Sequence, residues 1–198
     1  KSINSPKIQI IETIWDESQR EGGRVLALET DKAFQAISDQ ADWCFYIQGD
    51  EVIHENDYDN IRNAMAKYKD DPKIDGLLFE YCHLYGSYDY RATSSGWYRN
   101  EIRIVKNNKR IYSFRDAQGF RKDNNKKLCV AKSGATVYHY GWVKPPSKMQ
   151  AKQKSLSHKA SLNTSTSMQP ETEEPKHANI QMALIELLET PLDHEHVS

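Results

Sequence analysis

Two adjacent carboxylates at the end of an apolar stretch have types and spacing suited to metal chemistry. The sequence "DWCFYIQGDEVIHE" (42–55) runs from a tryptophan through apolar residues to Asp50 and Glu51. Mg²⁺ and Mn²⁺ prefer carboxylate oxygens, usually one or two of them together with substrate phosphates. Gly49 leaves room for such a ligand beside Asp50. The alternative is that the two acidic residues only cap the following turn, since acidic residues are common at strand ends.

A histidine late in the chain is the second candidate ligand. His139 stands in the aromatic run "VYHYGWVKPP" (137–146), where a packed, hydrogen-bonded core histidine is also common. Neutral imidazole is a good metal ligand, and this interpretation requires the fold to bring His139 to Asp50. Lys144 could contact a phosphate or remain in solvent. His54 is interpreted as a loop residue that begins the next helix, so His139 is the better candidate.

An aromatic loop and one further carboxylate are suited to a polar, flat-faced ligand such as a sugar. The loop "YGSYDYRATSSGWYRNE" (85–101) is rich in side chains that stack on flat polar ligands, or that pin a loop to the core. Asp116 is a candidate for a general base that deprotonates an acceptor hydroxyl. Asp116 equally fits a surface ion pair with Arg115 or Arg121.

The elements that must position these residues alternate along the first half of the chain. Apolar patterns predict strands at 7–15, 42–48 and 76–85, and helices at 25–40 and 56–69. Strand, helix, strand, helix, strand is the rhythm of an α/β domain with a largely parallel sheet.

The second half predicts further strands and then a polar tail. Residues 101–114 indicate two strands joined by a hairpin turn at Asn107-Asn108, and residues 127–143 indicate another strand or two. A polar helix is expected from Pro145 to about Lys159. Beyond it the chain is expected to be disordered, apart from a short amphipathic helix in "NIQMALIELLE" (179–189).

Composition excludes several classes of protein. A net charge of -1 argues against a nucleic-acid partner. Cys44, Cys82 and Cys129 form no CxxC pair, so we expect buried free thiols and a reducing, cytoplasmic location. No apolar run approaches the roughly 18 residues of a membrane-spanning helix, although a peripheral membrane association stays open.

Three segments, taken in chain order, resemble glycosyltransferase family 2. Residues 23–55 are similar to the family's helix, its "A-x-x-DW" lead-in and the acidic end of its strand. Residues 96–114 are similar to a later strand pair. Residues 138–153 are similar to an "H-x-G" segment whose histidine can complete a metal site. The resemblance extends over residues 7–153.

This resemblance implies a GT-A fold, a Rossmann-like α/β domain with a mixed, mainly parallel sheet flanked by helices. The domain would span residues 1–155, and 156–198 would form a polar, acidic tail. The implied activity is inverting hexosyl transfer from a nucleotide-sugar donor to a sugar or glycan acceptor, in carbohydrate biosynthesis. Asp50 and His139 would hold Mn²⁺ or Mg²⁺ against the leaving diphosphate. The predicted substrate contacts are Gln48, Lys32, Tyr85, Trp97, Arg99, Trp142 and Lys144. Asp116 lies in about the region of the family's catalytic carboxylate, and Glu101 is the second candidate for that role.

Two departures from the family pattern keep other functions open. Gln48 replaces the family's first aspartate; an amide can bind a ribose hydroxyl but binds a cation more weakly. The chain is also expected to begin at about the family's third strand, without the portion that holds the nucleotide base. The alternative is therefore a non-catalytic module that binds a carbohydrate or nucleotide. A phosphohydrolase using Asp50 and Mg²⁺ would require further carboxylates at strand ends, whereas Glu80 is predicted within a strand.

Overall fold

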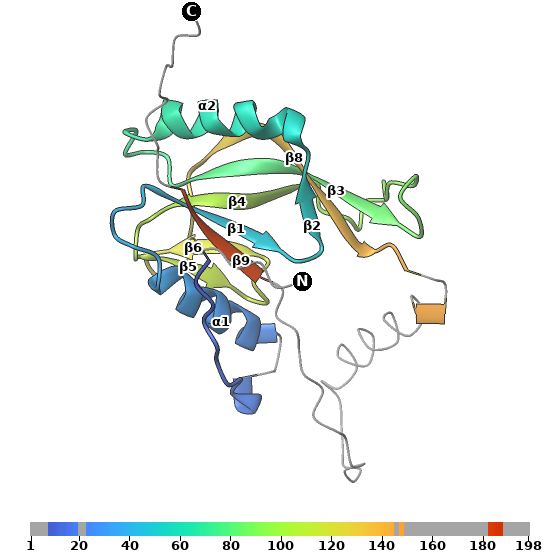
Figure 1. The fold of residues 1–198 in the computed structure, drawn as a ribbon, viewed down its shortest axis with the longest axis horizontal. Coiled ribbons are helices and arrows are strands. Elements are labelled where there is room, and N and C mark those ends of the chain that lie inside the picture. Colours follow the sequence, from blue (N-terminus) through green and yellow to red (C-terminus); the bar gives the residue numbers. More distant parts are fainter. Residues whose placement is uncertain (1–7, 20–22, 145–146, 149–181, 188–198) are drawn as a thin grey trace, which may run out of the picture.

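A six-stranded mixed sheet forms the centre of the computed structural model, which describes residues 8–19, 23–144, 147–148 and 182–187 (Figure 1). The strand order is β2-β8-β3-β4-β1-β9. The strands are β1 (Trp43–Gln48), β2 (Glu51–Ile53), β3 (Gly76–Tyr85), β4 (Asn100–Lys106), β8 (Val130–Trp142) and β9 (Met182–Leu187). Neighbouring strands are antiparallel, except that β3 and β8 are parallel.

The α/β class and the mixed sheet are confirmed, but the expectation of a mainly parallel sheet is wrong. The alternation of strands and helices over residues 7–85 predicted a largely parallel sheet, which would make strands such as β1 and β3 parallel. In the structure β4 lies between them and pairs antiparallel with both. The crossover that does produce a parallel pair joins β3 to β8, which comes much later in the chain.

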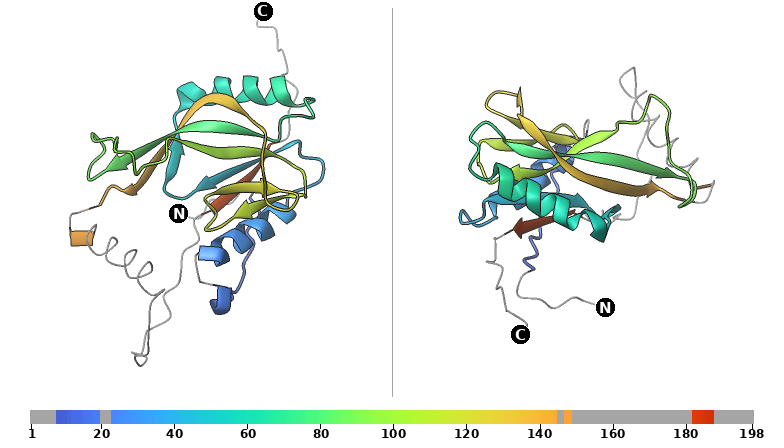
Figure 2. Two further views of the ribbon diagram at one scale, coloured as in Figure 1. Left: turned by 180° about the vertical axis from the view of Figure 1, so that it is seen from behind. Right: turned by 90° about the horizontal axis from the view of Figure 1, so that it is seen from above.

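Within the described residues, the helices α1 (Arg24–Gln35) and α2 (Tyr58–Tyr68) and a small second sheet complete the layers. Helix α2 covers one face of the main sheet, and helix α1 lies on the opposite side with the small sheet (Figure 2). The small sheet contains β5 (Ile111–Phe114), β6 (Gly119–Lys122) and β7 (Lys126–Lys127). Short 3-10 turns occupy Glu17–Gln19 and Glu55–Asp57. Separate apolar cores fill the two interfaces, one centred on Met65 and Phe79 and the other on Phe34 and Phe120.

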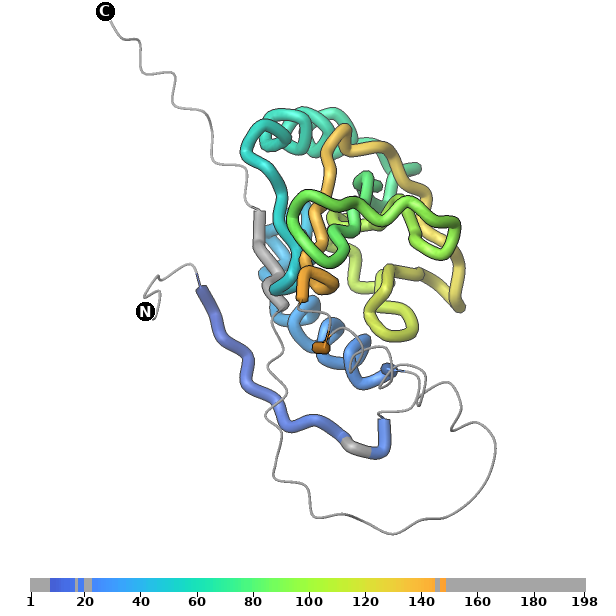
Figure 3. Tube along the Cα trace, turned by 90° about the vertical axis from the view of Figure 1, so that its right-hand side faces the viewer, coloured from blue at the N-terminus to red at the C-terminus, as the bar shows by residue number. Residues whose placement is uncertain are grey.

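The strand predicted at 7–15 is absent from the described part, residues 8–15. This segment has no regular structure and runs beside α1 (Figure 3). Its isoleucines face solvent, with Ile10 80% and Ile14 94% exposed, and the Thr13 hydroxyl donates to the Glu29 carboxylate. The outer edge of β1 is paired with β9, so the segment finds no strand partner there.

The later predictions are correct in position but wrong in pairing. Strands occur on both sides of Asn107-Asn108, but β4 belongs to the main sheet and β5 pairs with β6. The amphipathic helix predicted at 179–189 is wrong over its described part, because Met182–Leu187 is a strand antiparallel to β1. Apart from Ser147 and Lys148, which are helical, the helix predicted up to about Lys159 lies outside the described residues, as does the rest of the tail.

The predictions for the cysteines and for membrane-spanning helices can be compared with the structure. All three cysteines are free, and Cys44 and Cys82 are buried as expected. Cys129 is exposed, so the prediction of a buried thiol is wrong there. Within the part of the chain that the structure describes, no helix is long and apolar enough to cross a membrane.

Candidate functional site

Asp50 and His139 meet at one end of the main sheet. Asp50 lies in the tight turn between β1 and β2, and its carbonyl accepts the Tyr140 N–H at 2.8 Å. The antiparallel pairing of β2 with β8 then brings the Asp50 Oδ2 within 3.3 Å of the His139 Nε2. The Asp50 side chain is 45% exposed and that of His139 is 10% exposed. The contact between the two side chains is the one that the metal-ligand interpretation requires.

Gly141 keeps the space beside these two atoms clear. A Cβ at this position would lie 2.5 Å from both the Asp50 Oδ2 and the His139 Nε2. Two ligands that each lie about 2.1 Å from one ion, roughly at right angles, are about 3 Å apart. The observed separation of 3.3 Å is close to that value. Asp50 and His139 therefore fit as two ligands of Mn²⁺ or Mg²⁺.

His83 can fix the orientation and tautomer of His139. The two histidines are register partners on the parallel strands β3 and β8, and their Nδ1 atoms are 3.1 Å apart. Burial, and then the neighbouring His139, lower the pKa of His83 to about 4, although the Tyr98 carbonyl opposes this shift. A neutral His83 can accept a hydrogen bond from the Nδ1–H of His139. This tautomer leaves the His139 Nε2 lone pair free for a metal, as second-shell partners commonly arrange.

Glu51, in contrast, is buried and hydrogen-bonded inside the protein. Its carboxylate accepts from the Arg103 Nε at 2.9 Å and Nη2 at 2.6 Å, and from the Tyr81 hydroxyl at 2.5 Å. Both members of the ion pair are almost completely buried. A charged pair at this depth requires such complete hydrogen bonding. Of the two adjacent carboxylates, only Asp50 is therefore placed to bind a ligand.

Gln48 also has internal partners. Its amide nitrogen donates to the Tyr46 hydroxyl at 2.8 Å, and its backbone N–H donates to Glu51 at 3.2 Å. The Tyr46 hydroxyl lies 3.4 Å from the Ala117 carbonyl. Gln48 thus links the end of β1 to the turn that carries Asp116, and its predicted contact with the substrate stays a prediction.

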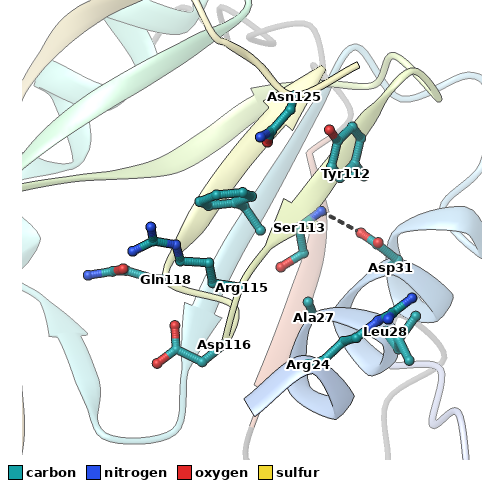
Figure 4. Close-up of a pocket in the computed structure, with 11 residues that line it drawn as sticks. Arg24, Ala27, Leu28, Asp31, Tyr112, Ser113, Arg115, Asp116, Gln118 and Asn125 are labelled. Carbon is teal, nitrogen blue, oxygen red and sulfur yellow. Dashed lines mark hydrogen bonds between the residues drawn. The ribbon is translucent and has the colours of Figure 1, made fainter. Parts of the chain in front are cut away.

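The two candidate bases lie close to one another at adjoining pockets. Asp116 lines a pocket of about 830 Å³ between α1 and the β5–β6 turn (Figure 4), and Glu101 lines one of about 520 Å³ beside β4 and β6. Arg115 and Gln118 line both pockets. Burial raises the pKa of Glu101 to about 7; Arg103, 3.7 Å away, opposes this shift, and the Glu51 and Asp116 charges add to it.

Asp116 does not form the ion pair that the sequence suggested. Among the described residues, neither Arg115 nor Arg121 makes a salt bridge with it. Both guanidinium groups instead lie over the Phe114 ring, at 5.2 Å and 4.3 Å from its centroid. The Asp116 carboxylate is exposed at the pocket rim.

Aromatic side chains surround the histidine pair on the side of the 86–98 loop. The Trp97 ring lies 4.6 Å from His83 and 5.5 Å from Trp142, and Tyr85 stacks on Trp142 at 6.3 Å. These contacts pin the loop to the sheet, yet all three large aromatics remain half-buried rather than enclosed. Tyr88, 72% exposed, extends the aromatic surface outward.

The remaining predicted residues lie outside this cluster or at its margin. Arg99 and Lys144 are exposed, just before β4 and just after β8. Lys32 lies on α1 in an ion pair with Glu29 at 2.7 Å. His54 is a loop residue as expected, because its Nδ1 accepts the Asn56 N–H at 3.1 Å. Glu80 is exposed within β3, so it offers no second acidic strand end of the kind a phosphohydrolase would require.

Three residues of this site were not identified from the sequence. Gly141 had one signal, the spacing of the "H-x-G" segment. His83 and Arg103 stand in apolar strands, and nothing local in the sequence distinguishes them from ordinary core positions. Their roles depend on strand partners that are 56 and 52 residues away along the chain.

The two candidate ligands stand without a third protein ligand in the described ranges. No group of three or more His, Cys, Asp or Glu side chains there is arranged to hold a metal ion.

Comparison of the chain with models of known protein families found no match, and a search of curated proteins found no similar sequence.

Proposed function

We propose that this protein transfers a sugar from a nucleotide-sugar donor to a hydroxyl of a sugar or glycan acceptor, with Mn²⁺ or Mg²⁺ bound by Asp50 and His139. The proposal depends above all on the 3.3 Å approach of these two side chains over the space that Gly141 leaves open. Two protein ligands leave coordination positions for phosphate oxygens, which is the usual way in which these cations are shared between protein and substrate.

The residues around the pair prepare it for this role. When bound, the cation supplies charge neutralisation for a diphosphate leaving group. The Nδ1 atoms of His83 and His139 are 3.1 Å apart, so His83 can hold His139 in the tautomer that presents Nε2, and Glu51 anchors the start of β2 through Arg103. The rings of Trp97 and Trp142 offer faces on which a flat base or a sugar can stack.

Glu101 is the proposed general base, with Asp116 as the second candidate. A carboxylate with a pKa near 7 is well matched to proton abstraction at neutral pH. In the proposed reaction the acceptor oxygen attacks the anomeric carbon while its proton passes to the Glu101 carboxylate. The bond from that carbon to the diphosphate breaks with its electron pair, and this displacement inverts the configuration. Asp116 assists because its charge helps to keep the Glu101 pKa high.

Metal binding and donor cleavage test the proposal separately. Mn²⁺ would be titrated into the protein by calorimetry, and the release of nucleoside diphosphate would then be followed with a panel of nucleotide-sugars. We expect Mn²⁺ binding in the wild type that is lost in Asp50→Asn and in His139→Gln. Asp59→Asn is the matched control, since the Asp59 side chain is 85% exposed on α2.

Each failure of this experiment has a distinct meaning. Absence of Mn²⁺ binding, or binding that survives both ligand substitutions, would refute the metal site. Metal and nucleotide-sugar binding without any diphosphate release would instead identify a non-catalytic binding module, and the transferase proposal would be wrong. Loss of turnover in Glu101→Gln with unchanged Mn²⁺ affinity is the result expected of a base.

A further inference from the structure

The larger pocket, between α1 and the β5–β6 turn, has the features of a ligand site. Neither Asp50 nor His139 lines it. Its volume of about 830 Å³ lies within the range of small-molecule sites. Asp31 and Arg24 contribute to it from α1, and Ser113 and Arg115 from the opposite side (Figure 4). The walls thus come from two separate elements, and a ligand could contact both.

Ser113 supplies a buried polar group beside this pocket that a ligand could satisfy. The residue is only 6% exposed, and its hydroxyl oxygen has no hydrogen-bond partner among the described residues. A buried hydroxyl without a partner costs free energy, so native proteins seldom retain one. Ser113 is one of the residues that line the pocket.

Asp31 lines the pocket beside Ser113. Its Oδ1 accepts the Ser113 backbone N–H at 2.6 Å, as Figure 4 shows. Burial nevertheless raises the pKa of Asp31 to about 6, and that one hydrogen bond only partly opposes the shift. A ligand hydroxyl that donates to this carboxylate would stabilise its charged form.

The charges and apolar groups of the pocket select the class of ligand. Two arginines, Arg24 and Arg115, are balanced by Asp31 and Asp116, so the walls carry no net charge to attract a strongly charged ligand. Apolar groups come from Leu28 on α1 and from Phe114 on β5. Acidic, guanidinium and hydroxyl groups around a partly apolar floor match the hydroxyls and C–H face of a sugar.

We propose that this pocket binds an uncharged sugar ring, through Asp31 and Ser113, as the acceptor subsite of the transferase. The acceptor role rests on the proposed function, whereas the binding itself does not. The adjoining pocket shares Arg115 and Gln118 and contains Glu101. A glycan whose ring lies in the larger pocket can therefore extend a hydroxyl toward the proposed base.

Saturation-transfer NMR on the full chain tests the binding without donor or metal. The probes are neutral hexoses, N-acetylhexosamines and their disaccharides, compared with uronic acids and sugar phosphates. We expect millimolar binding of at least one neutral sugar. Asp31→Asn should weaken it about tenfold and Ser113→Ala about threefold, as expected for a lost charged and a lost neutral hydrogen bond.

Two control variants separate binding from folding. Asp39→Asn is matched to Asp31→Asn, because Asp39 follows α1 with a side chain that is 92% exposed, and it should bind sugar as the wild type does. Ser113→Ala removes a buried hydroxyl without a partner, so its free energy of unfolding should not fall. A weaker affinity in this variant then reports the contact itself and not unfolding.

The outcomes also distinguish this proposal from the proposed function. Binding of charged sugars only, no sugar binding, or binding unaffected by both Asp31→Asn and Ser113→Ala would overturn the subsite. Sugar binding that persists in Asp50→Asn, a variant without Mn²⁺ affinity, supports the subsite independently of catalysis. The same binding in a protein that releases no nucleoside diphosphate would leave the subsite standing and refute the transferase.

Discussion

Replacing Glu101 with glutamine should stabilise the protein at alkaline pH and leave its stability unchanged at acidic pH. Glu101 is 9% exposed, and burial raises its pKa from 4.5 to about 7. Below pH 4.5 the carboxyl is neutral in both the folded and unfolded states. Between pH 4.5 and about 7 the folded state retains a proton that the unfolded state has lost, so the stability falls as the pH rises.

The expected gain in the free energy of unfolding follows from the shift in the Glu101 pKa. Each pKa unit corresponds to about 1.4 kcal/mol, so a shift from 4.5 to about 7 corresponds to about 3 kcal/mol above pH 7. Glutamine has nearly the same shape and is neutral at every pH. Arg103 retains its two hydrogen bonds to Glu51 in the variant, so the guanidinium is not left unpaired. The expected gain is therefore close to the whole pH-dependent contribution of Glu101.

Urea unfolding at a series of pH values measures the effect. The difference in the free energy of unfolding between Glu101→Gln and wild type should be near zero at pH 4.5 and rise to about 3 kcal/mol at pH 8.5. Asp31, whose pKa is raised to about 6, and His83, whose pKa is lowered to about 4, titrate in both proteins and largely cancel in the difference. Asp59→Asn is the exposed control and should give a flat difference.

A pH-independent difference between Glu101→Gln and wild type would refute the reasoning. So would a variant that is less stable than wild type at pH 8.5. Either result would mean that ionising Glu101 in the folded protein costs little free energy. Its pKa would then not be raised, and the argument for Glu101 as a base at neutral pH would fail.

Three further substitutions test the site around the metal pair. Gly141→Ala places a methyl group 2.5 Å from both proposed ligand atoms; we expect it to abolish Mn²⁺ binding in calorimetry, and unchanged affinity would contradict the site. His83→Phe removes the hydrogen-bond partner of His139 and should weaken Mn²⁺ binding about 10- to 100-fold, whereas equal affinity would show that the tautomer is set otherwise. Arg103→Met leaves Glu51 buried without its cation and should lower the free energy of unfolding by about 3–5 kcal/mol in urea; a loss below about 1 kcal/mol would show that the pair is not structurally required.

The local elements of this protein were largely determined by its sequence. Periodic apolar residues placed α2 within two residues of its observed ends and the start of α1 within one, although the helix predicted at 25–40 extends five residues beyond the observed end at Gln35. The apolar run 76–85 coincides with β3. The same local signals singled out Asp50 at the end of a strand and His139 within one. Such predictions succeed because helix and strand periodicity are properties of neighbouring residues.

Which strands pair with which was decided by the tertiary structure. Insertion of β4 between β1 and β3 makes the sheet mostly antiparallel, and β9 occupies the β1 edge, leaving Ile10 and Ile14 in solvent. An apolar run indicates a strand but does not indicate which strand it pairs with. That pairing depends on which strand edges, formed by segments far away in the sequence, remain free to be covered.

The site depends on the same long-range decisions. His139 is a ligand candidate only because β8 pairs with β2, and His83 becomes its hydrogen-bond partner only because β8 also pairs with β3. The sequence by itself identified Asp50 and His139 as candidates for metal ligands. The tertiary structure decided that these two side chains meet, that Glu51 is buried against Arg103, and that Glu101 lies where burial raises its pKa. The distances between these side chains and their burial are set only when segments far apart in the chain pack together.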